Sequence, residues 1–491
     1  NMSLSKSFIK DTAIYGMSSI VGRFLNWLLV PLYTAKLAAA GGGYGVITNV
    51  YSYTALLLVL LTFGMETTFF RFANNSKDKP DTVYSTVLIA VSAVALAFVA
   101  IVMLFLGEVS SWMEYPDHPE YVGIMAVVTA MDAVQAIIFA RLRYDRRPVK
   151  FAALKLLFIA LNIGLNLLYF VALPSLYAKN PGLVGIIYDP AVGVGYAFVA
   201  NIICTGAIML IMLHDLAKVK WQWDSGLMKR MLGYSWPILV LGIAGILNQT
   251  ADKILFPFVS KSENYMSELG IYGAAVKIAM IMAMITQAFR YAYEPIVFAR
   301  SNDKDSKQTY ADGMKYFVIF TLLAYLAVVM YIDILKYIIA DDYWSGLRVV
   351  PIVMAAELMM GVYFNLSFWY KLTDRTLWGA VFSGLGCAVL IAVNVLFVPK
   401  YSYMACAWAG VAGYGTAMLL SYFVGRKYYP VPYEVKRMAA YVAFCALLHW
   451  LSVVVAFDNM IANLAYRTLL IGLFAAAIFM AEVRPMLRRR K

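Results

Sequence analysis

Charged side chains are scarce in this sequence. They make up 14% of its 491 residues, whereas an ordinary soluble domain carries about 25%. Hydrophobic residues make up 62%, and they occur in runs of about 20 residues, the length needed to span a membrane as a helix. These runs are too long and too continuously apolar for the alternating strands of a membrane barrel. The composition therefore predicts an all-α polytopic membrane protein.

Residues for metal, redox or nucleotide chemistry are also few. The three histidines, His118, His214 and His449, stand apart without a partner constellation. The four cysteines lie in or beside apolar runs and show no metal-ligand spacing, so we expect no disulfide and no zinc site. A Walker A loop is lacking. We therefore expect no cofactor, no metal and no enzymatic activity, and the direct entry into a long apolar run predicts no cleavable signal peptide.

Fourteen apolar stretches divide the chain, and an even number returns both termini to one side of the membrane. The basic residues behind the net charge of +13 gather in short loops on that side, whereas the acidic WMEYPDHPE segment at 112–120 lies opposite. This asymmetry predicts cytoplasmic termini and argues against a nucleic-acid partner. The predicted spans are 8–34, 45–70, 82–107, 119–141, 149–173, 191–213, 231–258, 269–297, 313–339, 346–370, 375–398, 401–424, 436–457 and 461–482.

An internal repeat relates the two halves of the chain. LLVPLY at 28–33 resembles ILFPFV at 254–259, and the Gly45 and Gly270 neighbourhoods correspond, as do Glu66 and Glu294, all at offsets of about 226 residues. Six spans separate the copies, so the halves share one orientation and form two pseudo-symmetric six-helix bundles plus two C-terminal helices. The predicted domains are an N-terminal bundle at 1–215, an amphipathic cytoplasmic linker at 216–230, a C-terminal bundle at 231–430, and helices 13–14 with a basic tail at 431–491.

Polar residues interrupt several spans where lipid penalises them. In the eighth span four of them fall within about one third of the helix circumference, which predicts a stripe lining a wet cavity. An intramembrane Arg offers a planar fork of donors to phosphate or carboxylate, while an acid can compensate that charge or couple transport to an ion; both roles stay open. The substrate-binding candidates are Arg23, Asn26, Lys277, Gln287, Arg290 and Tyr291. The acidic candidates are Glu66, Asp252 and Glu294.

Further intramembrane polar residues are weaker candidates, since such groups often only bridge helices or anchor span ends. They are Arg71, Asp132, Lys155, Asn248, Glu357 and Asn365.

Five strings carry a family resemblance: KDTAIYGMSSIVGRFLNWLLVPLYT at 10–34, FGMETTFFRF at 63–72, QAFRYAYEP at 287–295, NLSFWYKLTDRT at 365–376 and FVPKYSYMACAWA at 397–409. Together they resemble the bacterial polysaccharide (O-antigen-type) flippases of the multidrug/oligosaccharidyl-lipid/polysaccharide exporter superfamily. The resemblance covers nearly the whole chain.

That resemblance implies alternating access in the bacterial inner membrane and a role in lipopolysaccharide O-antigen synthesis. A cationic central cavity would accept an undecaprenyl-diphosphate-linked oligosaccharide, and glycan polymerase or ligase machinery and membrane lipids would be partners. Arg23 and Arg290 fit the family's arginines by span. The second span departs from the pattern, because it offers Glu66 inside and Arg71 only at its end.

Two other functions stay open. A proton- or sodium-coupled multidrug antiporter of the same superfamily would share the fold, but cationic drugs favour an acidic site without an intramembrane Arg. A membrane glycosyltransferase or polysaccharide polymerase would need a large outer loop, and the predicted outer loops are short.

Overall fold

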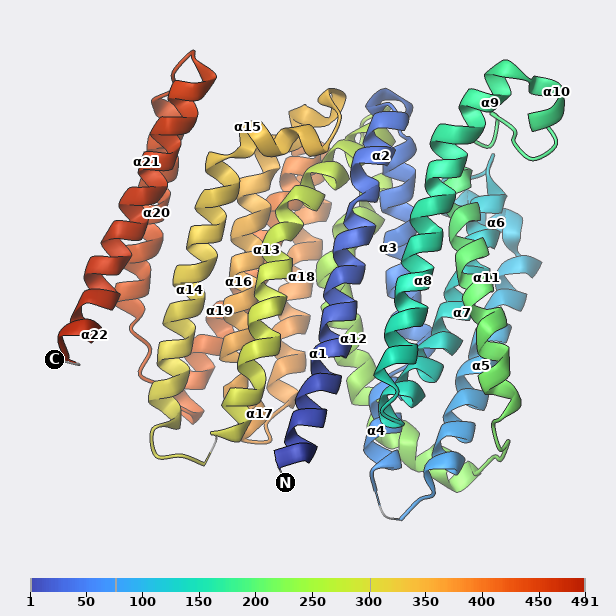
Figure 1. The fold of residues 1–491 in the computed structure, drawn as a ribbon, viewed down its shortest axis with the longest axis horizontal. Coiled ribbons are helices and arrows are strands. Elements are labelled where there is room, and N and C mark those ends of the chain that lie inside the picture. Colours follow the sequence, from blue (N-terminus) through green and yellow to red (C-terminus); the bar gives the residue numbers. More distant parts are fainter. Residues whose placement is uncertain (1, 76, 301, 490–491) are drawn as a thin grey trace. The chain divides into compact units, whose positions relative to one another are not determined.

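The computed structural model describes residues 2–75, 77–300 and 302–489, and every regular element in these ranges is helical (Figure 1). Fourteen helical stretches of this part of the chain are long and apolar enough to cross a membrane. The predicted all-α architecture and its number of spans are thus confirmed. The stretches are Ala13–Lys36, Gly43–Ala73, Pro80–Leu104, Pro119–Tyr144, Pro148–Lys179, Gly195–Ala217, Ser225–Val259, Tyr265–Arg290, Ser306–Met330, Asp341–Leu372, Leu377–Tyr401, Tyr403–Tyr428, Val435–Val454 and Met460–Arg489.

By its internal contacts the chain divides into two compact units, Asn1–Gly270 and Ile271–Lys491. The predicted division into bundles at 1–215 and 231–430 stays a prediction. The helices up to the boundary are α1 (Met2–Trp27), α2 (Leu29–Lys36), η1 (Ala39–Gly41), α3 (Gly43–Thr62), α4 (Met65–Ala73), α5 (Pro80–Leu104), α6 (Leu106–Trp112), α7 (Pro119–Tyr144), α8 (Pro148–Leu167), η2 (Leu168–Ala172), α9 (Leu173–Lys179), α10 (Pro181–Val184), α11 (Gly195–Ala217) and α12 (Ser225–Val259).

The helix α13 (Tyr265–Ala299) begins in the first unit and continues into the second. The remaining helices are α14 (Ser306–Met330), α15 (Ile332–Leu335), η3 (Lys336–Ile338), η4 (Asp341–Val349), α16 (Val350–Leu366), α17 (Phe368–Leu372), α18 (Leu377–Tyr401), α19 (Tyr403–Tyr428), α20 (Val435–Val454), α21 (Met460–Ile478), η5 (Phe479–Val483) and α22 (Arg484–Arg489).

A buried apolar core holds the first unit together. It joins α4, α5, α7, α8, α11 and α12, and Phe69, Ile137 and Leu227 are among its fully buried side chains. Prolines open α5, α7 and α8, where the missing N–H costs nothing because the first turn of a helix has no acceptor for it. Short loops between these spans therefore suffice to reverse the chain.

The second span is broken at Phe63 and Gly64. Both residues have positive φ, at 35° and 73°, and they separate α3 from α4. A side chain at Gly64 would meet the backbone oxygen of Ser235 at 3.0 Å, so glycine meets both the dihedral and the space requirement. The predicted span 45–70 thus consists of two helices, and the break changes the direction of α4, which carries Glu66 and Arg71.

The connection from α11 to α12 is extended and attached to the first unit. The Ser85 hydroxyl donates to the Gln222 carbonyl and accepts from the Gln222 backbone N–H, both at 2.7 Å. Arg230 forms an ion pair with Asp78 at 2.9 Å. The Asp224 side chain then caps α12 by accepting from the Leu227 backbone N–H at 3.0 Å.

Two repeat-related glycines touch in the first unit. A Cβ on Gly45 would lie 1.9 Å from the Met266 carbonyl oxygen, and a Cβ on Gly270 would lie 2.7 Å from the Gly45 nitrogen. The start of α3 therefore crosses the start of α13 at backbone distance. Residues that the repeat places in corresponding positions of the sequence thus lie together in space.

The second unit has its own core around α14. This helix packs against α16, α20 and α21, and Phe317, Leu326 and Phe474 are fully buried in the core. A glycine pair again permits close helix packing, because a Cβ on Gly386 in α18 would lie 2.7 Å from the Gly413 oxygen in α19.

Candidate functional site: two intramembrane polar clusters

One residue of the predicted stripe on α13, Arg290, lines a narrow pocket in the second unit. We call it the Arg290 pocket. Arg290 and Thr286 line it from α13, Gly361 and Asn365 from α16, and Lys371 from α17. Five aromatic rings complete the lining: Phe289, Tyr293, Phe317, Phe364 and Phe368. The structure thus brings Arg290 and Asn365 together, two residues that the sequence nominated separately.

Aromatic rings hold the two cations of this pocket. The Arg290 guanidinium carbon lies 4.6 Å from the centre of the Phe364 ring, and the Lys371 ammonium lies 5.6 Å from that of Phe368. A guanidinium stacked on a ring uses its face for that contact, whereas its N–H donors lie in its plane. The arrangement is therefore compatible with an anionic ligand bound edge-on to Arg290.

The Arg290 pocket is closed in this conformation. It offers about 10 Å³ to a water-sized sphere, close to the least that a single water needs. The Phe317 ring fills the space beside Gly361, where a Cβ would approach it to 2.2 Å. Entry of a larger ligand therefore requires movement of these aromatic side chains or of the helices that carry them.

The other stripe residues have different places. Gln287 is partly buried, and Lys277 is exposed. Both lie on α13 but not in the lining of the Arg290 pocket. The side chains of Tyr291 and Glu294, and that of Asn26 on α1, lie outside the described residues. Their predicted roles stay predictions.

A second polar cluster lies in the first unit, where α4, α7 and α8 meet, and we call it the Glu66 cluster. Glu66 Oε1 lies 3.7 Å from Arg143 Nη1. Lys155 on α8 interacts electrostatically with both Glu66 and Asp132, and its ammonium lies 4.1 Å from the centre of the Phe139 ring. The cluster thus combines two acids with two cations on three helices.

Arg143 and Lys371 were not among the predicted site residues. Arg143 belongs to a run of basic residues at the end of the fourth span, and the positive-inside rule explained that run without a site. Lys371 lies within NLSFWYKLTDRT, six residues after Asn365, at the end of the tenth span. For Lys371 the signal was its position within two helical turns of Asn365, whereas nothing in the sequence paired Arg143 with Glu66.

The remaining candidates are dispersed over the helices. Arg23 is exposed on α1, and Asp252 on α12 forms an ion pair with its neighbour Lys253 at 3.4 Å. The Arg71 guanidinium lies 5.5 Å from the ring centre of Tyr234. Asn248 and Glu357 are partly buried on α12 and α16. The structure does not place these residues in either cluster.

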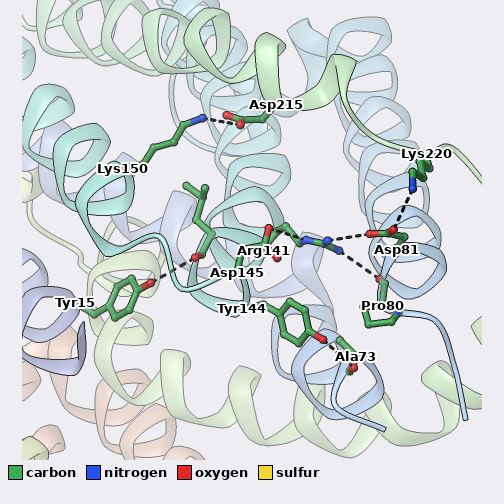
Figure 2. Close-up of polar contacts among 11 residues, drawn as sticks. Tyr15, Ala73, Pro80, Asp81, Arg141, Tyr144, Asp145, Lys150, Asp215 and Lys220 are labelled. Carbon is green, nitrogen blue, oxygen red and sulfur yellow. Dashed lines mark hydrogen bonds and ion pairs between the residues drawn. The ribbon is translucent and has the colours of Figure 1, made fainter. Parts of the chain in front are cut away.

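Polar contacts at the ends of α5, α7, α8 and α11 anchor the helices next to the Glu66 cluster (Figure 2). Arg141 bridges Asp81 at 2.9 Å and Asp145 at 3.0 Å. Lys150 pairs with Asp215 at 2.6 Å. Arg141 lies only two residues from Arg143, yet these contacts assign it to the joining of helices.

No group of three or more His, Cys, Asp or Glu side chains that could hold a metal ion occurs in the described parts of the chain.

Comparisons with known proteins agree on fold and family. The chain is similar to the lipid II flippase MurJ in an inward closed conformation, with 14% identity over 97% of this chain and 100% of that one and a TM-score of 0.70. It is also similar to an inward-facing multidrug resistance MATE transporter of the MOP superfamily (13% identity, 87% and 95% coverage, TM-score 0.56). A third similar structure is the MATE multidrug transporter DinF-BH (16% identity, 85% and 96% coverage, TM-score 0.57). At these identities the similarity establishes a shared fold.

The sequence search gives the family directly. No curated protein matched significantly. The profile of the family described as polysaccharide biosynthesis protein matches residues 8–296, which is more than half of the chain. This multi-pass membrane protein therefore belongs to the polysaccharide biosynthesis protein family.

Proposed function

We propose that the protein is a flippase that moves an undecaprenyl-diphosphate-linked oligosaccharide from the cytoplasmic to the outer leaflet of a bacterial inner membrane, by alternating access through a cationic cavity. The observation that carries the proposal is the Arg290 pocket, where an Arg and a Lys lie together at the ends of two membrane spans of a polysaccharide biosynthesis protein. A diphosphate is the charged part of such a substrate, and Arg is the side chain best suited to bind it at two oxygens.

The ring-lined walls suit the rest of the same headgroup. Phe289, Phe364 and Phe368 offer apolar faces beside the two cations, while Asn365 supplies an amide that both donates and accepts hydrogen bonds. A sugar has polar edges and less polar faces, so this combination fits a glycan next to a diphosphate. Opening of the closed pocket is then a step of the transport cycle.

In this proposal the acidic side chains balance the charge of the basic ones when no substrate is bound. Glu294 lies one helical turn after Arg290 on α13 and compensates its charge when no substrate is bound. In the Glu66 cluster the acids compensate Arg143 and Lys155.

The test is transport by the purified protein in proteoliposomes. The substrate is a fluorescent polyprenyl-diphosphate-linked oligosaccharide, and quenching from outside reports its arrival in the outer leaflet. We expect Arg290→Gln with Lys371→Gln to reduce the rate about 30-fold or more, because removing charged contacts to a desolvated phosphate costs about 2–5 kcal/mol. The matched control is Arg375→Gln, since Arg375 also stacks on an aromatic ring, Tyr428 at 4.2 Å, but does not line the pocket.

Two results would contradict the proposal. One is full transport by the double variant. The other is that the wild-type protein exports a cationic dye and leaves the lipid-linked oligosaccharide in place, which would favour a multidrug antiporter of the same fold.

A further inference from the structure

A large open cavity lies in the second unit and shares no lining residue with the Arg290 pocket, although Val431 of the cavity packs near Tyr293 and Phe368 of that pocket. Its volume is about 730 Å³, and it is formed by the last turns of α19, the connection that follows them and the first turn of α20. Twelve membrane spans precede this connection, so it lies on the same side of the membrane as the N-terminus. Because one span ends at Tyr428 and the next begins at Val435, the cavity lies at the depth of the lipid headgroups.

The lining of this cavity is basic and aromatic. Arg426, Lys436 and Arg437 contribute three cations, Glu434 contributes one acid, and Tyr422 and Tyr433 contribute phenol rings. Arg426 lies over the Tyr422 ring at 5.9 Å. Burial raises the pKa of Tyr433 well above its usual range, so its hydroxyl keeps its proton at cellular pH.

A buried ion-pair network fixes one wall of the cavity. Arg437 Nε lies 3.0 Å from Glu482 Oε1, and Lys315 Nζ lies 3.0 Å from Glu482 Oε2. Lys315 also pairs with Glu434 at 3.2 Å. Lys315 and Glu482 each expose only 7% of their side chains. The network therefore joins α14, η5 and the start of α20 and holds Arg437 in place.

The charges of this network balance, and two cations of the cavity remain. Lys315 and Arg437 are matched by Glu434 and Glu482. Arg426 and Lys436 are exposed, and within the described residues neither has an ion pair. The cavity thus carries an excess of about two positive charges at the membrane surface, beside rings that prefer the interface.

We propose that this cavity binds the phosphate-bearing headgroup of an anionic phospholipid, with Arg426 and Lys436 as its main ligands. Basic pockets between spans at the cytoplasmic surface are suited to such headgroups. A bound lipid would bridge the end of α19 and the start of α20, next to the network that ties α20 to α14. The proposed ligands Arg426 and Lys436 do not line the Arg290 pocket, so lipid binding here does not depend on the proposed transport activity.

The test compares lipid binding by the full-length protein in neutral detergent micelles. A fluorescent phosphatidylglycerol is titrated against wild type, against the double variant Arg426→Gln/Lys436→Gln, and against the control Lys218→Gln/Lys229→Gln, which removes two exposed basic residues of the first unit. We expect the cavity variant to bind about 25-fold more weakly, since each basic residue near the surface contributes about fivefold. The control should change binding less than twofold, and thermal unfolding of both variants checks that they are folded.

Competition distinguishes a lipid from a soluble phosphate compound. Phosphatidylcholine and inorganic phosphate are added separately to the wild-type complex. Displacement by unlabelled phosphatidylglycerol only supports the proposal. It is overturned by full displacement with millimolar inorganic phosphate, by equal competition from phosphatidylcholine, by unchanged binding to the cavity variant, or by an equal loss in the control.

Discussion

The two units differ in the side chains that surround their clustered cations. In the Glu66 cluster of the first unit, cations lie among acids: Arg143 pairs with Glu66, and Lys155 interacts with Glu66 and Asp132. In the Arg290 pocket of the second unit, the described lining contains two cations, one amide and five aromatic rings. In the first cluster acids lie next to the cations, whereas in the second the Arg290 guanidinium and the Lys371 ammonium lie over aromatic rings.

This difference separates two uses of a charged residue inside a membrane. Opposite charges that meet across helices stabilise one packing and leave a small net field. A guanidinium that lies face-on over an aromatic ring has its N–H donors in its own plane, which is the geometry that binding of an anion at two oxygens uses. The contrast therefore favours the Arg290 pocket for anion binding, and the Glu66 cluster for joining helices or for a charge that titrates.

Backbone packing, by contrast, is alike in the two units. Each contains a glycine pair at backbone distance, Gly45 with Gly270 in the first unit and Gly386 with Gly413 in the second. Small residues at such crossings let helices approach closely without a side chain between them. The units thus share a packing solution and differ in their chemistry.

The largest expected effect is a loss of stability when a methyl group is added at one of these close helix crossings. Gly45→Ala places a methyl group 1.9 Å from a backbone oxygen of Met266, so α3 and α13 must move apart, at a cost of about 3 kcal/mol. Gly386→Ala meets a carbonyl at 2.7 Å and should cost less. Gly41→Ala, with nothing within 4 Å, is the control. Thermal unfolding in detergent measures all three, and equal melting temperatures for Gly45→Ala and Gly41→Ala would refute the close crossing.

The next prediction tests the balance of the Glu66 cluster. Lys155→Met removes a cation that interacts with both Glu66 and Asp132 and should lower the free energy of unfolding by about 2 kcal/mol, less than for a fully buried pair because Lys155 is only partly buried. Adding Asp132→Asn removes one of the uncompensated acids and should restore at least half of the loss. If the double variant is less stable than the single one, Lys155 does not balance Asp132.

A third prediction concerns a variant that adds an acid to the Arg290 pocket, so that its cations lie beside a carboxylate as in the Glu66 cluster. Asn365→Asp changes no volume but adds a carboxylate beside the two cations, where it competes with an anionic substrate. We expect transport to fall about tenfold, equivalent to about 1.4 kcal/mol. Asn74→Asp at an exposed helix end is the control. Unchanged transport by Asn365→Asp would mean that the pocket does not bind the charged headgroup.

The smallest effect concerns the pair of Glu66 with Arg143. Each side chain is 47% exposed and the atoms are 3.7 Å apart, so solvent weakens the pair, and Glu66→Gln should change the free energy of unfolding by less than about 1 kcal/mol. A double-mutant cycle with Arg143→Gln measures the coupling in detergent. If Glu66 instead serves ion coupling, Glu66→Gln lowers transport and leaves unfolding unchanged.

The number and type of the spans followed from the sequence, because each run of about 20 apolar residues must form its backbone hydrogen bonds within one helix. Which of the candidate residues meet in one site did not follow from the sequence. Arg290 and Asn365 were separate candidates, and only the packing of α13 against α16 and α17 brought them together with Lys371. The polar stripe indicated one helix face, but a pattern on one helix does not specify which helix covers it.

Apolar length and the distribution of basic residues thus determined, in the sequence alone, an all-α membrane protein of fourteen spans. The repeat also singled out Gly45 and Gly270 as corresponding positions. The tertiary structure decided that these glycines touch, that Arg143 and not a stripe residue meets Glu66, and that aromatic rings hold Arg290 and Lys371. The physical reason is that burial and hydrogen bonding within a span are local properties, whereas the partner of a charge depends on helix contacts between residues far apart in the chain.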